Sequence, residues 1–348
     1  MSANFPAGTP VNVAVVGLGF MGVTHLRAYL GLSQARVVAV CDSQRLPVNG
    51  ILPGVTGNLT GSGDLDLGAR VRVYRRLDEL LADPEVQVVD LCTPTPLHAE
   101  QAVAALKAGK HVLCEKPLAR TSAAAREALK VAERSPGFLM PAMCMRFWPG
   151  WSRLKGVVEA GTYGAVLAAR FRRVSAMPAW SGQGTYAAGQ PHGGALFDLH
   201  IHDTDFVNYL FGRPAAVSSA GVTDADGNVN HIVTHYHYPG GPAVHAEGSW
   251  LLTDGFNMAY TLHCEHATLD FDLARGAEAL RVTERGQPPH PVHSGEGDGY
   301  SAEIAYFVSC VASGHRPAIV TARDAVTALE ICEAEEQSVR TGQPIRLA

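Results

Sequence analysis

The chain has 348 residues, which is more than one hydrophobic core usually supports, so two domains are expected. Apolar residues make up 47% and charged residues 18% of the chain, as in ordinary globular proteins. A net charge of −5 excludes the basic surface typical of nucleic-acid binding, and no apolar run reaches membrane length. The seven cysteines form no C-x-x-C pair and the first residues carry no export signal, so we expect a cytoplasmic protein without disulfides or a metal site.

The segment VNVAVVGLGFMG at 11–22 predicts a buried strand, a glycine turn and the start of a helix. Gly17 permits the sharp turn, Gly19 lets a pyrophosphate approach the backbone, and Gly22 allows helix and strand to pack closely. The N-terminus of the following helix then favours phosphate through its N–H groups and dipole. The predicted phosphate-binding turn comprises Gly17, Leu18, Gly19, Phe20, Met21 and Gly22.

The next strand, over 36–41, ends at Asp42, twenty residues after Gly22. A carboxylate at this distance accepts hydrogen bonds from an adenosine ribose and repels a 2′-phosphate. Arg45 lies close enough in the chain to soften that repulsion. The pattern therefore favours NAD as the cofactor and leaves NADP as the alternative.

Residues 43–70 are rich in Gly, Asn, Thr and Asp, which predicts a damaged helix or a long surface loop. Strands and helices then alternate. We expect strands over 71–74, 86–92, 111–115 and 138–143, and helices over 77–82, 97–108 and 122–134. Such alternation predicts a doubly wound parallel sheet of the Rossmann type.

Ligands bind outside the carboxyl ends of the strands in such a sheet, so the side chains at these ends are candidates for the site. They are Asp42, Thr93, Thr95 and Lys116. An ammonium group beside a nicotinamide can stabilise negative charge that develops on a hydroxyl or carbonyl oxygen. The alternative for Lys116, flanked by Glu115 and Pro117, is an ordinary surface lysine in a turn.

After about residue 148 the pattern becomes that of a mostly antiparallel sheet. A helix over 151–161 precedes strand-like runs at 165–174, 216–222, 231–238, 243–252, 258–264, 267–272 and 279–283, and two helices over 300–312 and 321–340 end the chain. We predict a dinucleotide-binding domain of residues 1–145 and an α+β domain of residues 146–348 built on a large open sheet. Because helices cover only one face, we expect a homodimer or homotetramer through the other face.

The segment GGALFDLHIHDTD at 193–205 predicts a helix that carries Asp198 and His202 on one face, four residues apart. A carboxylate can orient an imidazole, which titrates near neutrality and is suited to removing a proton from a secondary alcohol. His200 lies on roughly the opposite face, which argues against both histidines binding one metal ion. The alternative is an Asp–His pair on the helix surface.

Three stretches together resemble the Gfo/Idh/MocA oxidoreductase family, which includes glucose–fructose oxidoreductase and inositol dehydrogenase. They are GLGFMG after a strand, TPTPLHAEQAVAALKAGKHVLCEKPLA at 93–119, and GGALFDLHIHDTD. The resemblance implies a catalytic set of Lys116, Asp198 and His202, with His202 as the proton acceptor. This family commonly has glycine where the chain has His200, so the role of His200 is left open.

The resemblance also implies further cofactor and substrate residues. Thr93, Thr95 and His98 would line the nicotinamide, with Glu115 in the same cofactor set, and Arg146 would approach the substrate. His192 lies in a Gly-rich stretch with Trp180 and Tyr186, and these side chains either wall a sugar pocket or simply pack.

The function expected from this resemblance is an NAD(P)-dependent dehydrogenase acting on a secondary alcohol of a sugar, inositol or related polyol. One alternative is a glycoside hydrolase of the same fold that holds NAD tightly and regenerates it. Another is a regulator that senses the dinucleotide without catalysis, but the presence of both Lys116 and His202 argues against it.

Overall fold

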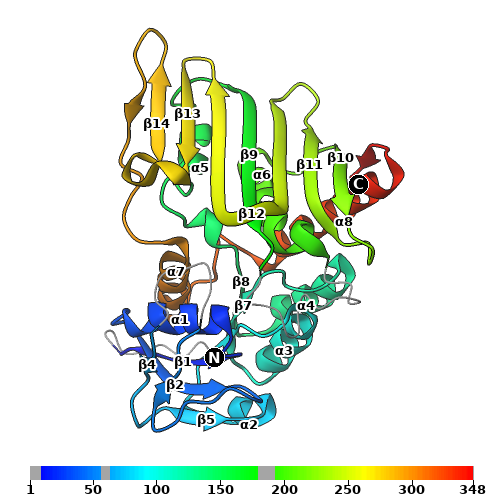
Figure 1. The fold of residues 1–348 in the computed structure, drawn as a ribbon. Coiled ribbons are helices and arrows are strands. Elements are labelled where there is room, and N and C mark those ends of the chain that lie inside the picture. Colours follow the sequence, from blue (N-terminus) through cyan, green and yellow to red (C-terminus); the bar gives the residue numbers. More distant parts are fainter. Residues whose placement is uncertain (1–8, 56–62, 179–192, 348) are drawn as a thin grey trace. The chain divides into compact units, whose positions relative to one another are not determined.

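The computed structural model describes residues 9–55, 63–178 and 193–347 (Figure 1). The chain divides into two compact units, the first of Met1–Phe147 with Gly297–Val326 and the second of Trp148–Glu296 with Thr327–Ala348. Within the described ranges, no helix combines the length and the apolar character needed to cross a bilayer.

The first unit contains a six-stranded sheet in the order β5-β2-β1-β6-β7-β8, and every adjacent pair is parallel. The doubly wound parallel sheet predicted from the sequence is confirmed. Its central strands are largely buried on both faces and consist mainly of apolar residues. The strands are β1 (Val11–Val16), β2 (Ala35–Cys41), β5 (Arg72–Tyr74), β6 (Val88–Leu91), β7 (His111–Glu115) and β8 (Leu139–Ala142).

The helices of this unit are α1 (Phe20–Leu30), α2 (Leu77–Leu81), α3 (Thr95–Lys107), α4 (Ser122–Arg134), the short η1 (Cys144–Arg146) and α7 (Gly299–Ser313). Helix α3 begins two residues earlier than expected, because proline is accepted in the first turn of a helix and Pro96 occupies it. The region 43–70 contains a small antiparallel pair, β3 (Ile51–Leu52) and β4 (Leu65–Asp66), which the sequence had suggested as a damaged helix or a loop.

Helix α7 returns to the first unit, where it packs against α1, β1, β8 and η1 (Figure 1). Its buried residues Ile304, Phe307, Val308 and Val311 supply the apolar stripe for this packing. The single boundary expected at 145–146 omits this return. An apolar stripe predicts that a helix is covered, but it carries no information on which sheet covers it.

The second unit is built on a large antiparallel sheet. Figure 1 shows β9 (Val166–Ala176) between the two limbs of β12 (Ala243–Cys264), a strand that reverses around Gly255. Ser249 on one limb and Asn257 on the other both pair with Val174 of β9. These limbs are the two separate strands that the sequence predicted. The other strands are β10 (Ala216–Thr223), β11 (Val229–His237), β13 (Ala267–Asp272), β14 (Leu280–Glu284), β15 (His290–Pro291) and β16 (Ile345–Arg346).

Aromatic side chains form the core of this unit. Trp151 lies edge-on to Phe206 and to Tyr260, with ring centroids 5.1 Å apart in both pairs. Tyr260 stacks on Phe271 and donates a hydrogen bond of 2.7 Å to the carbonyl oxygen of Gly150. Phe206 belongs to α6 (Ile201–Phe211), so this cluster holds α6 against the sheet. Two further helices are α5 (Leu154–Glu159) and α8 (Ala322–Thr341).

Candidate functional site

The glycine turn between β1 and α1 leaves room for a ligand at one position only. A Cβ atom on Gly17, whose φ is +87°, would lie 2.6 Å from the carbonyl oxygen of Cys92, and one on Gly22 would lie 1.9 Å from that of Gly17. Gly19 is exposed, and no heavy atom of the described residues lies within 4 Å of the corresponding position. Helix α1 has no side-chain cap at its N-terminus. The turn therefore fits a pyrophosphate that approaches bare backbone at Gly19.

Alanine substitutions at Gly19 and Gly22 should separate the binding role from the packing role of this turn. Gly19→Ala should fold normally, since its φ of −71° suits any residue, but should weaken NADH binding because the methyl group occupies the phosphate position. Gly22→Ala should lower the temperature at which half of the protein is unfolded, because the new methyl group would overlap the carbonyl oxygen of Gly17 and the backbone of the turn would have to shift. Thermal melts and NADH fluorescence titrations measure both effects. Equal thermal loss in the two variants would contradict this assignment.

Asp42 follows β2 and joins the glycine turn to the next loop. Its Oδ2 accepts a hydrogen bond of 2.8 Å from the backbone N–H of Leu18, and its Oδ1 accepts bonds of 2.8 and 2.9 Å from those of Gln44 and Arg45. The Arg45 guanidinium donates to the carbonyl oxygens of Leu18 and Gly54. The carboxylate is thus fixed beside the turn by backbone amides.

The end of β6 is tied to the segment after β7 by His98, which is 1% exposed. Its Nε2 lies 2.6 Å from the carbonyl oxygen of Thr93, and its Nδ1 lies 2.8 Å from that of Pro117. Burial lowers the pKa of His98, so the neutral ring donates to one of these carbonyls. Its contacts make His98 a linker between two strand ends. Thr93 and Thr95 are half-buried, and the Thr93 hydroxyl donates to Gln101.

Lys116 directly follows β7 and is half-buried. Its backbone N–H donates a hydrogen bond of 3.0 Å to Oε2 of Glu115, and its peptide bond to Pro117 is cis. Glu115 itself is buried, and its Oε1 lies 3.2 Å from Nε2 of His25. The predicted cofactor residue Glu115 therefore faces the interior of the unit and the Lys116 amide.

In the second unit, the segment 193–211 is not one regular helix. Residues Leu196–His200 form a π-helical turn (η3), which continues directly into α6. Asp198 lies in this turn and His202 in the first turn of α6, and both are half-buried. π-turns are rare and are found mostly at functional positions.

His200, by contrast, is fully buried in a polar network of the second unit. Its Nε2 lies 3.3 Å from Oε1 of Glu335 and 3.3 Å from the hydroxyl oxygen of Tyr236. Thr204 also donates to Glu335, at 3.2 Å from Oε2. A Cβ atom on Gly248 would lie 2.5 Å from the Cβ atom of His200, so the His200 side chain packs directly against the backbone of Gly248. His200 therefore has a role in folding, and its half-buried neighbour His202 remains the predicted base.

The two predicted substrate residues receive no support from the described geometry. Arg146, in η1, is 3% exposed, donates a bond of 2.7 Å to the carbonyl oxygen of Ile319 and lies 3.4 Å from Asp324. These contacts are all within the first unit. His192 lies outside the described residues, as do Trp180 and Tyr186.

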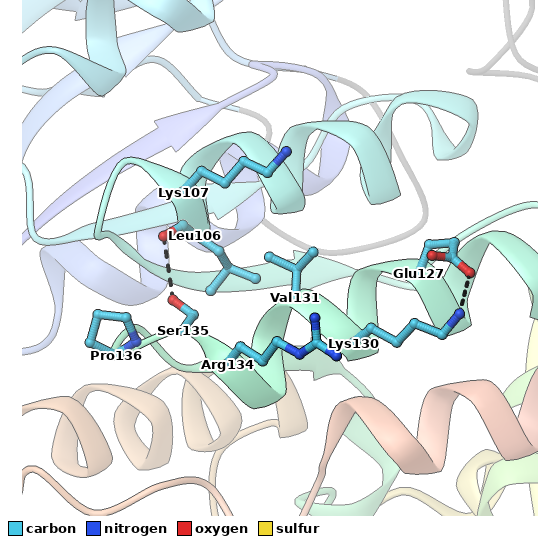
Figure 2. Close-up of a pocket in the computed structure, with 8 residues that line it drawn as sticks. All are labelled: Leu106, Lys107, Glu127, Lys130, Val131, Arg134, Ser135 and Pro136. Carbon is cyan, nitrogen blue, oxygen red and sulfur yellow. Dashed lines mark hydrogen bonds and ion pairs between the residues drawn. The ribbon is translucent and has the colours of Figure 1, made fainter.

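Figure 2 shows a cavity of about 430 Å³ between α3 and α4. The cavity is lined by three basic side chains, Lys107, Lys130 and Arg134, and by the apolar side chains of Leu106 and Val131. Lys130 forms an ion pair of 2.7 Å with Glu127. None of the predicted cofactor, catalytic or substrate residues that the structure describes lines this cavity. It is a surface groove, distinct from the dinucleotide turn.

The sequence reasoning missed a buried cluster around His25 in the first unit. Its Nδ1 lies 2.8 Å from Oδ2 of Asp90, and the Cys92 sulfur lies 3.5 Å from the same nitrogen. Among the described residues, these three form the only group of His, Cys, Asp or Glu side chains close enough to share a metal ion. Asp90 could have been noticed, because a carboxylate inside an otherwise apolar parallel strand needs a partner. All seven cysteines are free.

Comparison with known proteins agrees with both halves of the chain. Residues 11–143 match the model described as "Oxidoreductase family, NAD-binding Rossmann fold", and residues 151–270 match the GFO/IDH/MocA C-terminal domain. Inositol 2-dehydrogenase of Rhizobium meliloti is 25% identical over 97% of this chain and 99% of its own length. Levoglucosan dehydrogenase of Pseudarthrobacter phenanthrenivorans is 32% identical, but the match covers 60% of this chain and 53% of that protein.

Solved structures show the same fold over nearly the whole chain. A levoglucosan dehydrogenase in complex with NADH and L-sorbose has a TM-score of 0.82 at 21% identity and covers 98% of this chain and 99% of that chain. An aldose-aldose oxidoreductase from Caulobacter crescentus has a TM-score of 0.80 at 22% identity over 97% of this chain and 100% of that chain. With its parallel Rossmann sheet, glycine turn and large antiparallel sheet, the chain belongs to the Gfo/Idh/MocA oxidoreductase family, as the sequence motifs predicted.

Proposed function

We propose that this protein is an NAD-dependent dehydrogenase that oxidises a secondary alcohol of a sugar, inositol or related polyol. The proposal rests on two features of the first unit. One is the glycine turn, where a phosphate can approach the backbone at Gly19. The other is Lys116, whose backbone amide is held at the end of β7 by the buried Glu115 carboxylate. The relatives named as dehydrogenases of levoglucosan, inositol and D-apiose support the substrate class. Because their named substrates differ, they support a class and not one compound.

The mechanism assigns one task to each predicted catalytic side chain. Bound nicotinamide supplies the acceptor for the hydride that leaves the alcohol carbon. The His202 imidazole takes the hydroxyl proton, and the Lys116 ammonium stabilises negative charge on that oxygen. Asp198 orients the imidazole and supports its protonated form.

We propose NAD over NADP because of what surrounds Asp42. Three backbone amides fix its carboxylate at the end of β2, where it would repel a 2′-phosphate. The nearby cation, Arg45, donates hydrogen bonds to the carbonyl oxygens of Leu18 and Gly54. These bonds hold its guanidinium group against the backbone of the loop and not beside a 2′-phosphate. These contacts support a site for the ribose hydroxyls of NAD.

A panel of sugars, anhydrosugars and inositols, offered with NAD or NADP, tests the function. We expect the absorbance of the reduced cofactor to increase with at least one polyol, and to increase faster with NAD, which gives NADH, than with NADP, which gives NADPH. Cleavage of a glycoside without net NADH would support the hydrolase instead. NADH binding without turnover of any panel member would support the non-catalytic regulator.

We also propose that the face of the second unit's sheet without helices joins two copies of this chain. His235 pairs across the strands with His245, the neighbouring Arg172 and Glu247 lie 3.3 Å apart, and Val233 remains 40% exposed on this face. Such a mixed polar and apolar surface is typical of protein interfaces. A two-fold contact between the same face of two copies is self-complementary.

Light scattering after gel filtration at micromolar concentration should give the mass of a dimer or tetramer. Val233→Glu should shift that mass towards the monomer, because it places a charge at the centre of the contact. Leu97→Glu is the matched control, since Leu97 is 42% exposed but lies on α3 of the first unit. A monomeric mass for the unmodified protein would contradict the proposal.

A further inference from the structure

In the first unit, the fully buried imidazole of His25 lies between two carboxylates. Its Nδ1 faces Oδ2 of Asp90 at 2.8 Å, and its Nε2 faces Oε1 of Glu115 at 3.2 Å. A ring whose two nitrogens both face carboxylate oxygens is best satisfied when both carry a proton. The geometry therefore favours an imidazolium that bridges α1, β6 and β7.

Other titratable groups surround this bridge. Cys92 lies 3.5 Å from Nδ1, and the Tyr300 ring lies 6.4 Å from the imidazole. Tyr29 and Glu303 are also fully buried nearby and interact electrostatically with the cluster. Burial raises the pKa of the Glu303 carboxyl well above its usual value, which keeps this carboxyl neutral.

The charges of the bridge support one another. Burial by itself would lower the pKa of His25, but the Asp90 carboxylate raises it well above the ordinary value. Burial would raise the pKa of Glu115, but its contact with His25 lowers it. Each group is therefore charged because its neighbour is charged, and removal of the imidazolium would leave two buried carboxylates without compensation.

The bridge ends at the candidate catalytic lysine. While Oε1 of Glu115 faces His25, its Oε2 accepts the hydrogen bond from the backbone N–H of Lys116. His25 lies three residues beyond Gly22 on α1, the helix that begins at the phosphate turn. The turn and the Lys116 backbone are thus joined through one short chain of buried polar contacts.

We propose that His25 is a positioning residue, which fixes the Glu115 carboxylate and through it the backbone of Lys116 relative to the dinucleotide turn. The inference rests on the proposed catalytic role of Lys116. A displacement of about 1 Å in a reacting group can lower a rate by about 100-fold, so a residue with no contact to substrate can still control turnover.

A double-mutant cycle between His25→Gln and Lys116→Ala tests the connection, with NAD and the best polyol of the panel. We expect His25→Gln alone to lower kcat by about 10–100-fold with little change in the Kd for NADH. In the Lys116→Ala background the same change should have almost no further effect, because the group it positions is gone. Equal fold losses in both backgrounds would overturn the inference. Unchanged turnover in Lys116→Ala alone would instead overturn the proposed function.

Amide hydrogen exchange provides a readout that needs no substrate. In full-length His25→Gln, the peptide covering residues 111–119 should exchange faster than in the unmodified protein, since the Lys116 amide loses its fixed acceptor. Unchanged exchange there would count against the inference. If His25→Gln does not fold, Glu115→Gln takes its place, and a smaller change in the same direction is expected because only the charge is removed.

Glu303→Gln is the matched control. Glu303 is buried in the same cluster, but its carboxyl oxygens have no hydrogen-bond partner among the described residues. His25, by contrast, forms the 3.2 Å ion pair with Glu115, so Glu303 lies off the path from His25 to Lys116. This variant should retain the kcat of the unmodified protein and its exchange over 111–119. An equal loss in Glu303→Gln and His25→Gln would show a general effect of the cluster on folding and would also overturn the inference.

Discussion

Replacement of His202 by alanine should lower kcat by about 10²–10⁴-fold and leave the Kd for NADH unchanged, because a general base contributes to the chemical step alone. His202 is half-buried at the start of α6, directly after a π-turn. Steady-state rates with the best polyol of the panel, together with NADH fluorescence titration, measure the two quantities. Turnover close to that of the unmodified protein would contradict the assignment.

The matched control for this prediction is His200→Ala, two residues away. His200 is buried beside Glu335 and Tyr236, so its loss should remove about 1–3 kcal/mol from the free energy of unfolding. The folded fraction should keep nearly full turnover. If His200→Ala abolished turnover without affecting unfolding, the roles of the two histidines would have to be exchanged.

The second large effect is expected at Arg173, which forms a bidentate pair with Asp203. Its Nε and Nη2 donate to the two carboxylate oxygens at 2.9 and 3.1 Å, and the side chains are only 4% and 0% exposed. Arg173→Met would leave the Asp203 carboxylate buried without its cation, at a cost of about 3–5 kcal/mol in the free energy of unfolding. Adding Asp203→Leu should restore much of this loss, since no uncompensated charge then remains.

Arg172 offers the control for this experiment on the same strand. It faces Glu247 at 3.3 Å with both side chains about one-third exposed, so Arg172→Met should change the free energy of unfolding by less than about 1 kcal/mol. All four tryptophans lie between residues 148 and 250, so urea unfolding followed by tryptophan fluorescence reports on the second unit. Similar losses in the two methionine variants would contradict the special role of Arg173.

Local pattern predicted much of this fold. The strand over 111–115 and the helix over 122–134 have the expected bounds. Both depend on the local spacing of apolar residues and on neighbouring residues that end or begin the element, such as the N-cap Thr121 before α4. The reversal of β12 around Gly255 also agrees with two predicted strands joined by turn residues. These features are decided by interactions within a few residues.

The buried polar groups could not be predicted in the same way, because their partners lie far along the chain. His200 is 135 residues from Glu335, and Arg173 is 30 residues from Asp203. The π-turn at Leu196–His200 likewise has no local signal, since it depends on how the segment packs against Gly248 and its neighbours. The motif resemblance predicts Lys116 and His202 as catalytic and Glu115 and His98 as cofactor residues; it carried no sign that Glu115 and His98 are buried.

The return of α7 to the first unit has a consequence for synthesis of the protein. Residues 297–326 emerge from the ribosome some 150 positions after Phe147, yet they supply the helix that packs against α1, β1 and β8. The nascent dinucleotide-binding half therefore exposes this apolar side while residues 148–296, with all strands of the antiparallel sheet except β16, are translated. A polypeptide that stops at Glu296 should consequently bind chaperones or aggregate, whereas completion through Val326 closes the first unit.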